Sequence, residues 1–260
     1  MRIIILPDAP SVSSRAADIF CRLLQDLPDA VLGLATGGTP LGTYNELVRR
    51  NRAGEISFAE VTTFNLDEYV GIPRNHSQSY HNFMHQNFFS HININVDNCR
   101  LPDGEAADLM TECHRYEKMI DDVGGIDLQI LGIGSDGHIA FNEPGSSLAS
   151  RTRVKALTQQ TRLDNSRFFH SLDEVPRVAI TMGVGTILEA DHILLLATGA
   201  SKAQAVHDFV EGPVTAMVPA SALQLHPQVT VLLDETAASK LDRRDYYNHV
   251  EAIQRELEGM

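Results

Sequence analysis

A glycine-rich stretch of the chain carries three titratable side chains that together could transfer protons. Asp136, His138 and Glu143 lie within eight residues, directly after an apolar run typical of a buried strand. An imidazole between two carboxylates suits proton transfer, because the acids fix its tautomer and stabilise its charged form. A structural histidine is the alternative, but three titratable groups at a glycine-rich strand end are hard to explain by packing. We interpret them as an acid–base site.

Two further acids follow another β-rich run, at residues 61–65. Asp67 and Glu68 stand just past its end, where one carboxylate could act as a base. Acids at strand ends are more often helix caps or solvated loop residues. These two positions alone therefore leave catalysis as the minority interpretation.

A third strand end carries a short run of glycines. The apolar residues 30–35 lead into Gly37, Gly38 and Thr39, with Pro40 next. Thr39 is expected to cap a helix that has Pro40 at its first position. Bare backbone amides beside a helix N-terminus favour phosphate binding, although a plain tight turn explains the same residues.

Lys202 is the last of these features. It follows the apolar run 192–197 and Gly199, in what is expected to be the first turn of a helix. An ammonium group there could bind a phosphate. A solvated lysine is the simpler explanation of this residue taken by itself.

Short β-rich runs alternate with helical patterns along the chain, which is typical of an α/β fold with a mainly parallel sheet and helices on both faces. In such sheets ligands bind beyond the carboxyl ends of the strands. The expected strands are near 2–6, 30–35, 61–65, 126–132, 178–182, 192–197 and 229–233. The expected helices are near 11–26, 40–52, 79–89, 106–122, 201–210 and 240–257.

The organisation of the chain favours one domain over residues 1–260, because no Pro/Gly/Ser-rich linker divides it. The stretch 144–176 is the least regular, and we interpret it as a mobile, lid-like segment. A net charge of -13 argues against a nucleic-acid partner or a basic membrane face. The apolar start stops at Pro7, and the three scattered cysteines indicate a reducing compartment, so we expect a cytoplasmic protein.

These segments together resemble the glucosamine/galactosamine-6-phosphate isomerase family, which includes the glucosamine-6-phosphate deaminases. The resemblance keeps both order and spacing, and it runs from about residue 31 to residue 235. The segments that carry it are TGGTP at 36–40, FNLDEY at 64–69, GSDGHIAFNEP at 134–144, SLASRTR at 147–153 and NSRFF at 165–169.

The resemblance implies a modified Rossmann-like fold and the conversion of glucosamine 6-phosphate and water to fructose 6-phosphate and ammonia, in amino-sugar catabolism. By that likeness His138 passes a proton to the sugar ring oxygen and opens the ring, while Asp136 and Glu143 orient and tune it. Asp67 then removes the C2 proton as general base. The family's phosphate-binding residues correspond here to Gly37, Gly38, Thr39, Arg167 and Lys202.

Neither step demands a metal or an organic cofactor, and we expect none. His81 and His85 lie four residues apart on an expected helix, but the glutamate of the HExxH motif is missing. We therefore interpret this pair as part of a packed helix and not as a metal site.

The resemblance also implies regulation and assembly. Some family members are hexamers that N-acetylglucosamine 6-phosphate activates at a subunit interface, so we expect a homo-oligomer and an allosteric enzyme. The residues that resemble this second phosphate site are Ser146, Ser147, Arg153, Lys155 and Tyr246.

Two other functions remain open. A 6-phosphogluconolactonase-like hydrolase has a related fold and binds a sugar phosphate, but it would not require Asp67 together with Asp136, His138 and Glu143. A non-catalytic sugar-phosphate sensor should keep the glycine loop and lose the acids, and here all the acids are present.

Overall fold

The main sheet has seven strands, and every neighbouring pair in it is parallel. The structure is a computed structural model that describes residues 1–166, 169 and 171–259. In spatial order the strands are β1 (Arg2–Leu6), β10 (Val229–Asp234), β9 (His192–Ala197), β6 (Leu128–Leu131), β2 (Val31–Leu34), β3 (Thr62–Asn65) and β5 (Cys99–Arg100). The predicted α/β fold with a mainly parallel sheet is confirmed.

A second, antiparallel sheet has the order β4 (Asp67–Tyr69), β8 (Val178–Thr181) and β7 (Arg153–Ala156). The strand predicted at 178–182 forms, but it belongs to this small sheet. β4 and β7 were not predicted, because both are short and rich in charged residues, and neither shows the apolar pattern of a buried strand. Part of the stretch expected to be irregular is thus ordered, since β7 and α5 (Gln159–Ser166) lie in it.

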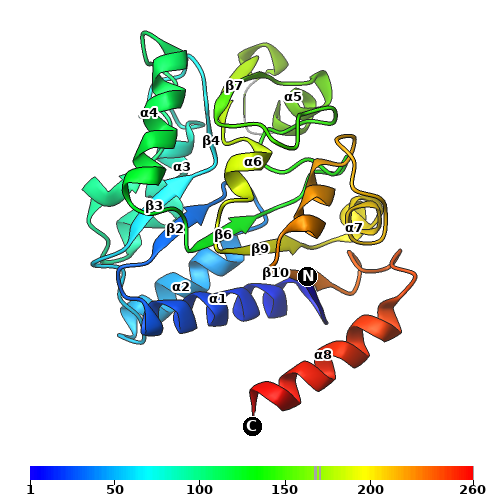
Figure 1. The fold of residues 1–260 in the computed structure, drawn as a ribbon. Helices are drawn as coiled ribbons and strands as arrows, with labels where there is room; N and C mark the ends of the chain where they lie inside the picture. The colour runs from blue at the N-terminus through cyan, green and yellow to red at the C-terminus, as the bar shows by residue number, and fades with distance from the viewer. Residues whose placement is uncertain (167–168, 170, 260) are drawn as a thin grey trace.

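Helices cover both faces of the main sheet, as predicted. Figure 1 shows α1 and α2 beneath the sheet, and α4, α6 and the small sheet above it. The helices other than α5 are α1 (Ala9–Asp26), α2 (Leu41–Arg52), α3 (Tyr80–Asn87), α4 (Leu109–Asp122), α6 (Val184–Ile187), α7 (Ala203–Val210) and α8 (Arg244–Glu258). Short 3-10 helices lie at Phe89–His91, Val96–Asn98, Leu172–Glu174, Ala200–Lys202 and Pro219–Leu225. Among the described residues, no helix is both long enough and apolar enough to pass through a bilayer.

The amphipathic pattern of α1 shows why it packs on the sheet. Val12, Ala16, Phe20 and Leu24 follow one another at four-residue spacing, and all are buried. Asp8 caps the N-terminus by accepting a hydrogen bond from the backbone N–H of Ser11 at 2.8 Å. The sequence thus encodes both the buried face of this helix and its start.

The start of α2 differs by one residue from the prediction. The helix begins at Leu41, and Pro40 is the cap residue, with helical backbone angles and no side-chain capping bond. Its missing N–H makes proline suitable at either position, because the first amides of a helix have no partner within the helix.

Four neighbouring strands bring the predicted site residues to one edge. β9, β6, β2 and β3 are adjacent and parallel, so their carboxyl ends face the same side of the molecule. Two buried tyrosines hold the chain where it leaves this edge. The Tyr44 hydroxyl donates to the carbonyl oxygen of Ala35 at 2.6 Å, and the Tyr116 hydroxyl donates to that of Asn65 at 2.7 Å.

We predict that Tyr44→Phe lowers the free energy of unfolding by about 1–3 kcal/mol, because the buried carbonyl of Ala35 loses its donor. Urea denaturation followed by circular dichroism measures the change. Tyr246→Phe is the control, since Tyr246 is 60% exposed. Equal stability of Tyr44→Phe and the unmodified protein would show that this hydrogen bond does not hold the start of the glycine loop.

Candidate active site

Asp136 and His138 form a hydrogen-bonded pair in the loop after β6. Nδ1 of His138 lies 2.6 Å from Oδ1 of Asp136, and the backbone N–H of His138 donates to the same oxygen at 3.2 Å. The hydrogen bond from His138 lowers the pKa of Asp136. With Nδ1 donating its proton to the carboxylate, Nε2 keeps its lone pair and can accept a proton. The predicted function of the acid as an orienting group fits this geometry.

Glycine at position 134 makes room for the imidazole. A Cβ atom there would lie 2.2 Å from Cε1 of His138, which is far inside van der Waals contact. The backbone N–H of Gly134 also donates to the carbonyl oxygen of His138 at 2.9 Å, which closes the loop on itself. The glycine-rich character of this loop therefore has a direct steric cause.

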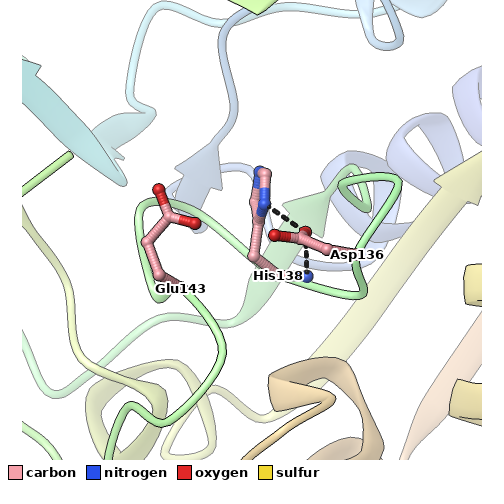
Figure 2. A group of neighbouring side chains, drawn as sticks. All are labelled: Asp136, His138 and Glu143. Atoms are coloured by element: carbon pink, nitrogen blue, oxygen red, sulfur yellow. Dashed lines mark hydrogen bonds and ion pairs between the residues drawn. The ribbon is translucent and has the colours of Figure 1, made fainter. Parts of the chain in front are cut away.

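Glu143 completes the group of three, but it contacts neither partner through a hydrogen bond. It is 3% exposed, and its Oε1 accepts from Thr161 Oγ1 at 2.5 Å. One carboxylate oxygen from each of Asp136 and Glu143 and one ring nitrogen of His138 lie within 4.8 Å of one another. Figure 2 shows the imidazole standing between the two carboxylates. The predicted arrangement is therefore present, with Asp136 as the direct partner of His138.

The two acids at the end of β3 have separate environments. Glu68 accepts hydrogen bonds from the backbone N–H groups of Tyr80 and His81, each at 3.0 Å, and lies 2.9 Å from Nδ1 of His81. It therefore caps α3, which was the simpler interpretation of these acids. Burial, followed by the nearby charge of Glu68, raises the pKa of Asp67 to about 8. Asp67 thus has the buried, perturbed carboxyl expected of a general base.

Thr181 connects Asp67 to the acid–base loop, which is the loop after β6 that carries Asp136, His138 and Glu143. It is paired with Asp67 in the antiparallel register of β4 and β8. Its Oγ1 accepts a hydrogen bond at 3.2 Å from the backbone N–H of Phe141, two residues before Glu143. The small sheet therefore fixes the base relative to the acid–base loop, and nothing in the spacing of the sequence indicated this link.

Four of the five predicted phosphate-binding residues follow strands that end on this edge of the sheet. Gly37, Gly38 and Thr39 follow β2, and a Cβ atom on Gly132 after β6 would lie 3.7 Å from the Thr39 side chain. Lys202 ends the 3-10 helix after β9, the neighbour of β6 on its other side. Arg167 lies outside the described residues.

The residues predicted for an allosteric site are not all close together within one chain. Arg153 and Lys155 are two residues apart on β7, and Arg153 Nη1 donates to Asn142 Oδ1 at 2.8 Å. Ser146 is buried and Ser147 exposed in the turns that precede β7. Tyr246 lies on α8, and Figure 1 shows α8 and β7 on opposite sides of the molecule.

Within the described part of the chain, two groups of side chains have ligand atoms close enough together to hold a metal ion. One is Asp136, His138 and Glu143, and the other is His207, Glu211 and Asp242. In the first group Nδ1 of His138 already bonds to Asp136, so an ion would use Nε2 or displace that bond. The expectation of a metal-free reaction therefore stays a prediction.

The fold and site define an α/β enzyme with acid–base groups at the carboxyl edge of a parallel sheet. Residues 7–232 match the family described as glucosamine-6-phosphate isomerases/6-phosphogluconolactonase, and the chain belongs to this family. A glucosamine-6-phosphate deaminase of Arthrobacter sp. is 55% identical, with 96% of each chain covered. The enzyme of that name from Hahella chejuensis is 54% identical, with 100% of this chain and 99% of the relative covered.

Solved structures of related proteins have the same fold as this chain. A monomeric glucosamine-6-phosphate deaminase superposes with a TM-score of 0.91 at 49% identity, over 92% of this chain and 100% of that one. A 6-phosphogluconolactonase from Trypanosoma cruzi superposes with a TM-score of 0.75 at 22% identity, over 93% of this chain and 97% of that one. The second likeness establishes a shared fold and nothing further.

We predict that Asp67→Asn changes how stability depends on pH. The folded-state pKa of about 8 lies above that of an unfolded aspartate, so the folded state binds more protons and stability falls as pH rises from about 4 to about 8. The asparagine variant lacks this loss. Its free energy of unfolding should therefore rise relative to that of the unmodified protein by up to about 1.4 kcal/mol per pH unit over that range.

Urea denaturation at pH 5, 6.5 and 8 measures the difference. Asp122→Asn is the control, because it makes the same substitution at a side chain that is 58% exposed. Parallel pH profiles for Asp67→Asn and the unmodified protein would contradict the raised pKa of Asp67.

Proposed function

We propose that this protein is a glucosamine-6-phosphate deaminase, which converts glucosamine 6-phosphate and water to fructose 6-phosphate and ammonia. The observation that carries the proposal is the buried Asp67 on the same sheet edge as a separate acid–base pair, in a chain similar over almost its whole length to deaminases. Ring opening and transfer of the C2 proton are two proton transfers, and they need two independent acid–base groups.

In the proposed mechanism His138 acts first. Nε2 of His138 gives and takes the proton that opens the sugar ring, and the hydrogen bond from Nδ1 to Asp136 keeps the imidazole in the required orientation. The neighbouring Glu143 supports the charged form of the imidazole. This assigns ring opening to the loop after β6.

Asp67 acts next on the open-chain sugar. Its carboxylate removes the proton from C2, and the resulting enolamine is protonated at C1. Water then adds to the imine at C2, and ammonia leaves. Only the ionised carboxylate can accept the C2 proton, so a pKa of about 8 makes Asp67 a strong base once it is ionised. The reaction joins an aldose–ketose isomerisation to hydrolysis of an imine.

The phosphate would bind beyond β2 and β9. The Gly37–Gly38–Thr39 loop supplies backbone amides and Lys202 an ammonium group, and both follow strands that flank β6. We include Arg167 as a third phosphate ligand, contributed by the lid-like segment at 144–176. We also propose a cytoplasmic location, which the three free cysteines support.

Regulation by N-acetylglucosamine 6-phosphate, in a homo-oligomer such as a hexamer, is a further part of the proposal. Arg153 supports it, because this predicted activator ligand donates to Asn142, the residue next to Glu143. A bound phosphate on Arg153 would therefore act one residue from the acid–base group. Tyr246 could join that site only from a second copy of the chain. The solved relative at 49% identity is described as monomeric, so assembly requires its own measurement.

We predict that the purified protein releases ammonia from glucosamine 6-phosphate, and that a chelator leaves the rate unchanged. Asp67→Asn should reduce exchange of the C2 proton with solvent by at least about 1000-fold, while substrate binding changes little, because only the base is lost. Coupled detection of ammonia and deuterium exchange by NMR measure the two effects.

The control for this experiment is Asp122→Asn, which should behave like the unmodified protein. Hydrolysis of 6-phosphogluconolactone without ammonia release would favour the lactonase alternative instead. Loss of activity with the chelator would overturn the metal-free mechanism, and full exchange in Asp67→Asn would remove Asp67 from its role.

We predict sigmoidal dependence of the rate on substrate that becomes hyperbolic when N-acetylglucosamine 6-phosphate is added. Arg153→Gln should abolish that response, because the activator's phosphate loses its guanidinium partner. Steady-state kinetics and analytical ultracentrifugation test activation and assembly together. Hyperbolic kinetics that the acetylated sugar does not alter would rule out the regulatory proposal.

A further inference from the structure

The carboxylate of Glu143 accepts its hydrogen bonds from the segment that follows β7. Thr161 Oγ1 donates to Oε1 of Glu143 at 2.5 Å, and Thr158 Oγ1 donates to the same oxygen at 3.3 Å. Glu143 is 3% exposed and Thr161 is 5% exposed. Because both side chains are buried, water cannot readily replace the Thr161 hydroxyl as a donor.

The other carboxylate oxygen of Glu143 remains available to the site. Oε2 is buried and has no hydrogen-bond partner among the residues that the structure describes. Figure 2 shows the carboxylate on the opposite side of the imidazole from Asp136. The bonds to Oε1 therefore set where the carboxylate lies, because nothing in that part of the chain anchors its second oxygen.

The start of α5 places both hydroxyls, because Thr158 directly precedes the helix and Thr161 lies in its first turn. Thr158 Oγ1 accepts from the backbone N–H of Thr161 at 3.2 Å, as a helix cap does, and residues three apart share one face of a helix. Arg162, the next residue, donates to the carbonyl oxygen of Leu172 at 2.8 Å. The geometry at Glu143 thus depends on the placement of α5 and of the chain that follows it.

We propose that Thr161 is a positioning residue for the reaction. Its hydroxyl holds the carboxylate of Glu143 beside His138, and it can do so only while the first turn of α5 is in place. This inference rests on the proposed function, in which Glu143 supports the imidazole during ring opening.

The test compares two substitutions at position 161. Thr161→Val removes the hydroxyl and keeps the shape, and should lower kcat for ammonia release about 10- to 100-fold with KM changed by less than about threefold. Thr161→Ser keeps the donor and should stay within about fivefold of the unmodified kcat. Thr152→Val is the matched control, because Thr152 is 6% exposed and its hydroxyl has no partner among the described residues.

A double-mutant cycle separates positioning from a general structural effect. In a Glu143→Ala background, Thr161→Val should reduce kcat by less than about threefold further, because both changes interrupt the same hydrogen bond. Equal losses in the two backgrounds would overturn the positioning role. So would a Thr161→Val kcat equal to that of Thr152→Val.

Separate controls distinguish a variant that does not fold from a failure of the proposed function. Thr161→Ala with Thr152→Ala repeats the comparison if circular dichroism shows that the valine variant does not fold. An unmodified protein that releases no ammonia from glucosamine 6-phosphate would overturn the proposed function itself. An active protein whose Thr161 variants are all equally active would overturn only the role of Thr161.

Discussion

The parallel pairing of β9, β6, β2 and β3 aligns four strands whose carboxyl ends emerge at one edge of the sheet. Strands that pair in parallel all run in the same direction, so their carboxyl ends lie on the same side of the sheet. Residues as distant in sequence as Thr39, Asp67, His138 and Lys202 therefore follow strands that end on the same side. The other elements refine the positions that this pairing brings together.

Burial of carboxyl groups is the main electrostatic constraint at this edge. Glu68 and Asp67 are neighbours in sequence and both are buried, yet their carboxyl groups have different surroundings. Backbone amides at the start of α3 compensate the charge of Glu68, and it serves as a cap. Burial raises the pKa of Asp67 instead. A carboxyl left in this state is poorly suited to stability and well suited to accepting a proton from carbon.

The small antiparallel sheet joins groups that the main sheet does not hold together. β8 contributes Thr181, which is paired with Asp67 on β4 and accepts a hydrogen bond from the loop that carries Glu143. β7, on its other side, contributes Arg153, which bonds to Asn142. Three short strands thus connect the base, the acid–base loop and the predicted activator site.

The sequence by itself determined the parallel α/β architecture, because alternating β-rich runs and amphipathic helices leave few other packings. It also indicated Asp136, His138 and Glu143, since their spacing after a buried strand is unusual. The local residues did not separate Asp67 from Glu68, and only the family resemblance singled out Asp67. The amides that bind Glu68 come from α3, twelve residues away, so the local sequence does not show them. Nor could the sequence identify Thr161. This threonine belongs to no motif, and only the packing of α5 places its Oγ1 2.5 Å from Oε1 of Glu143. Such contacts depend on how separate elements pack, and only the tertiary structure decides that.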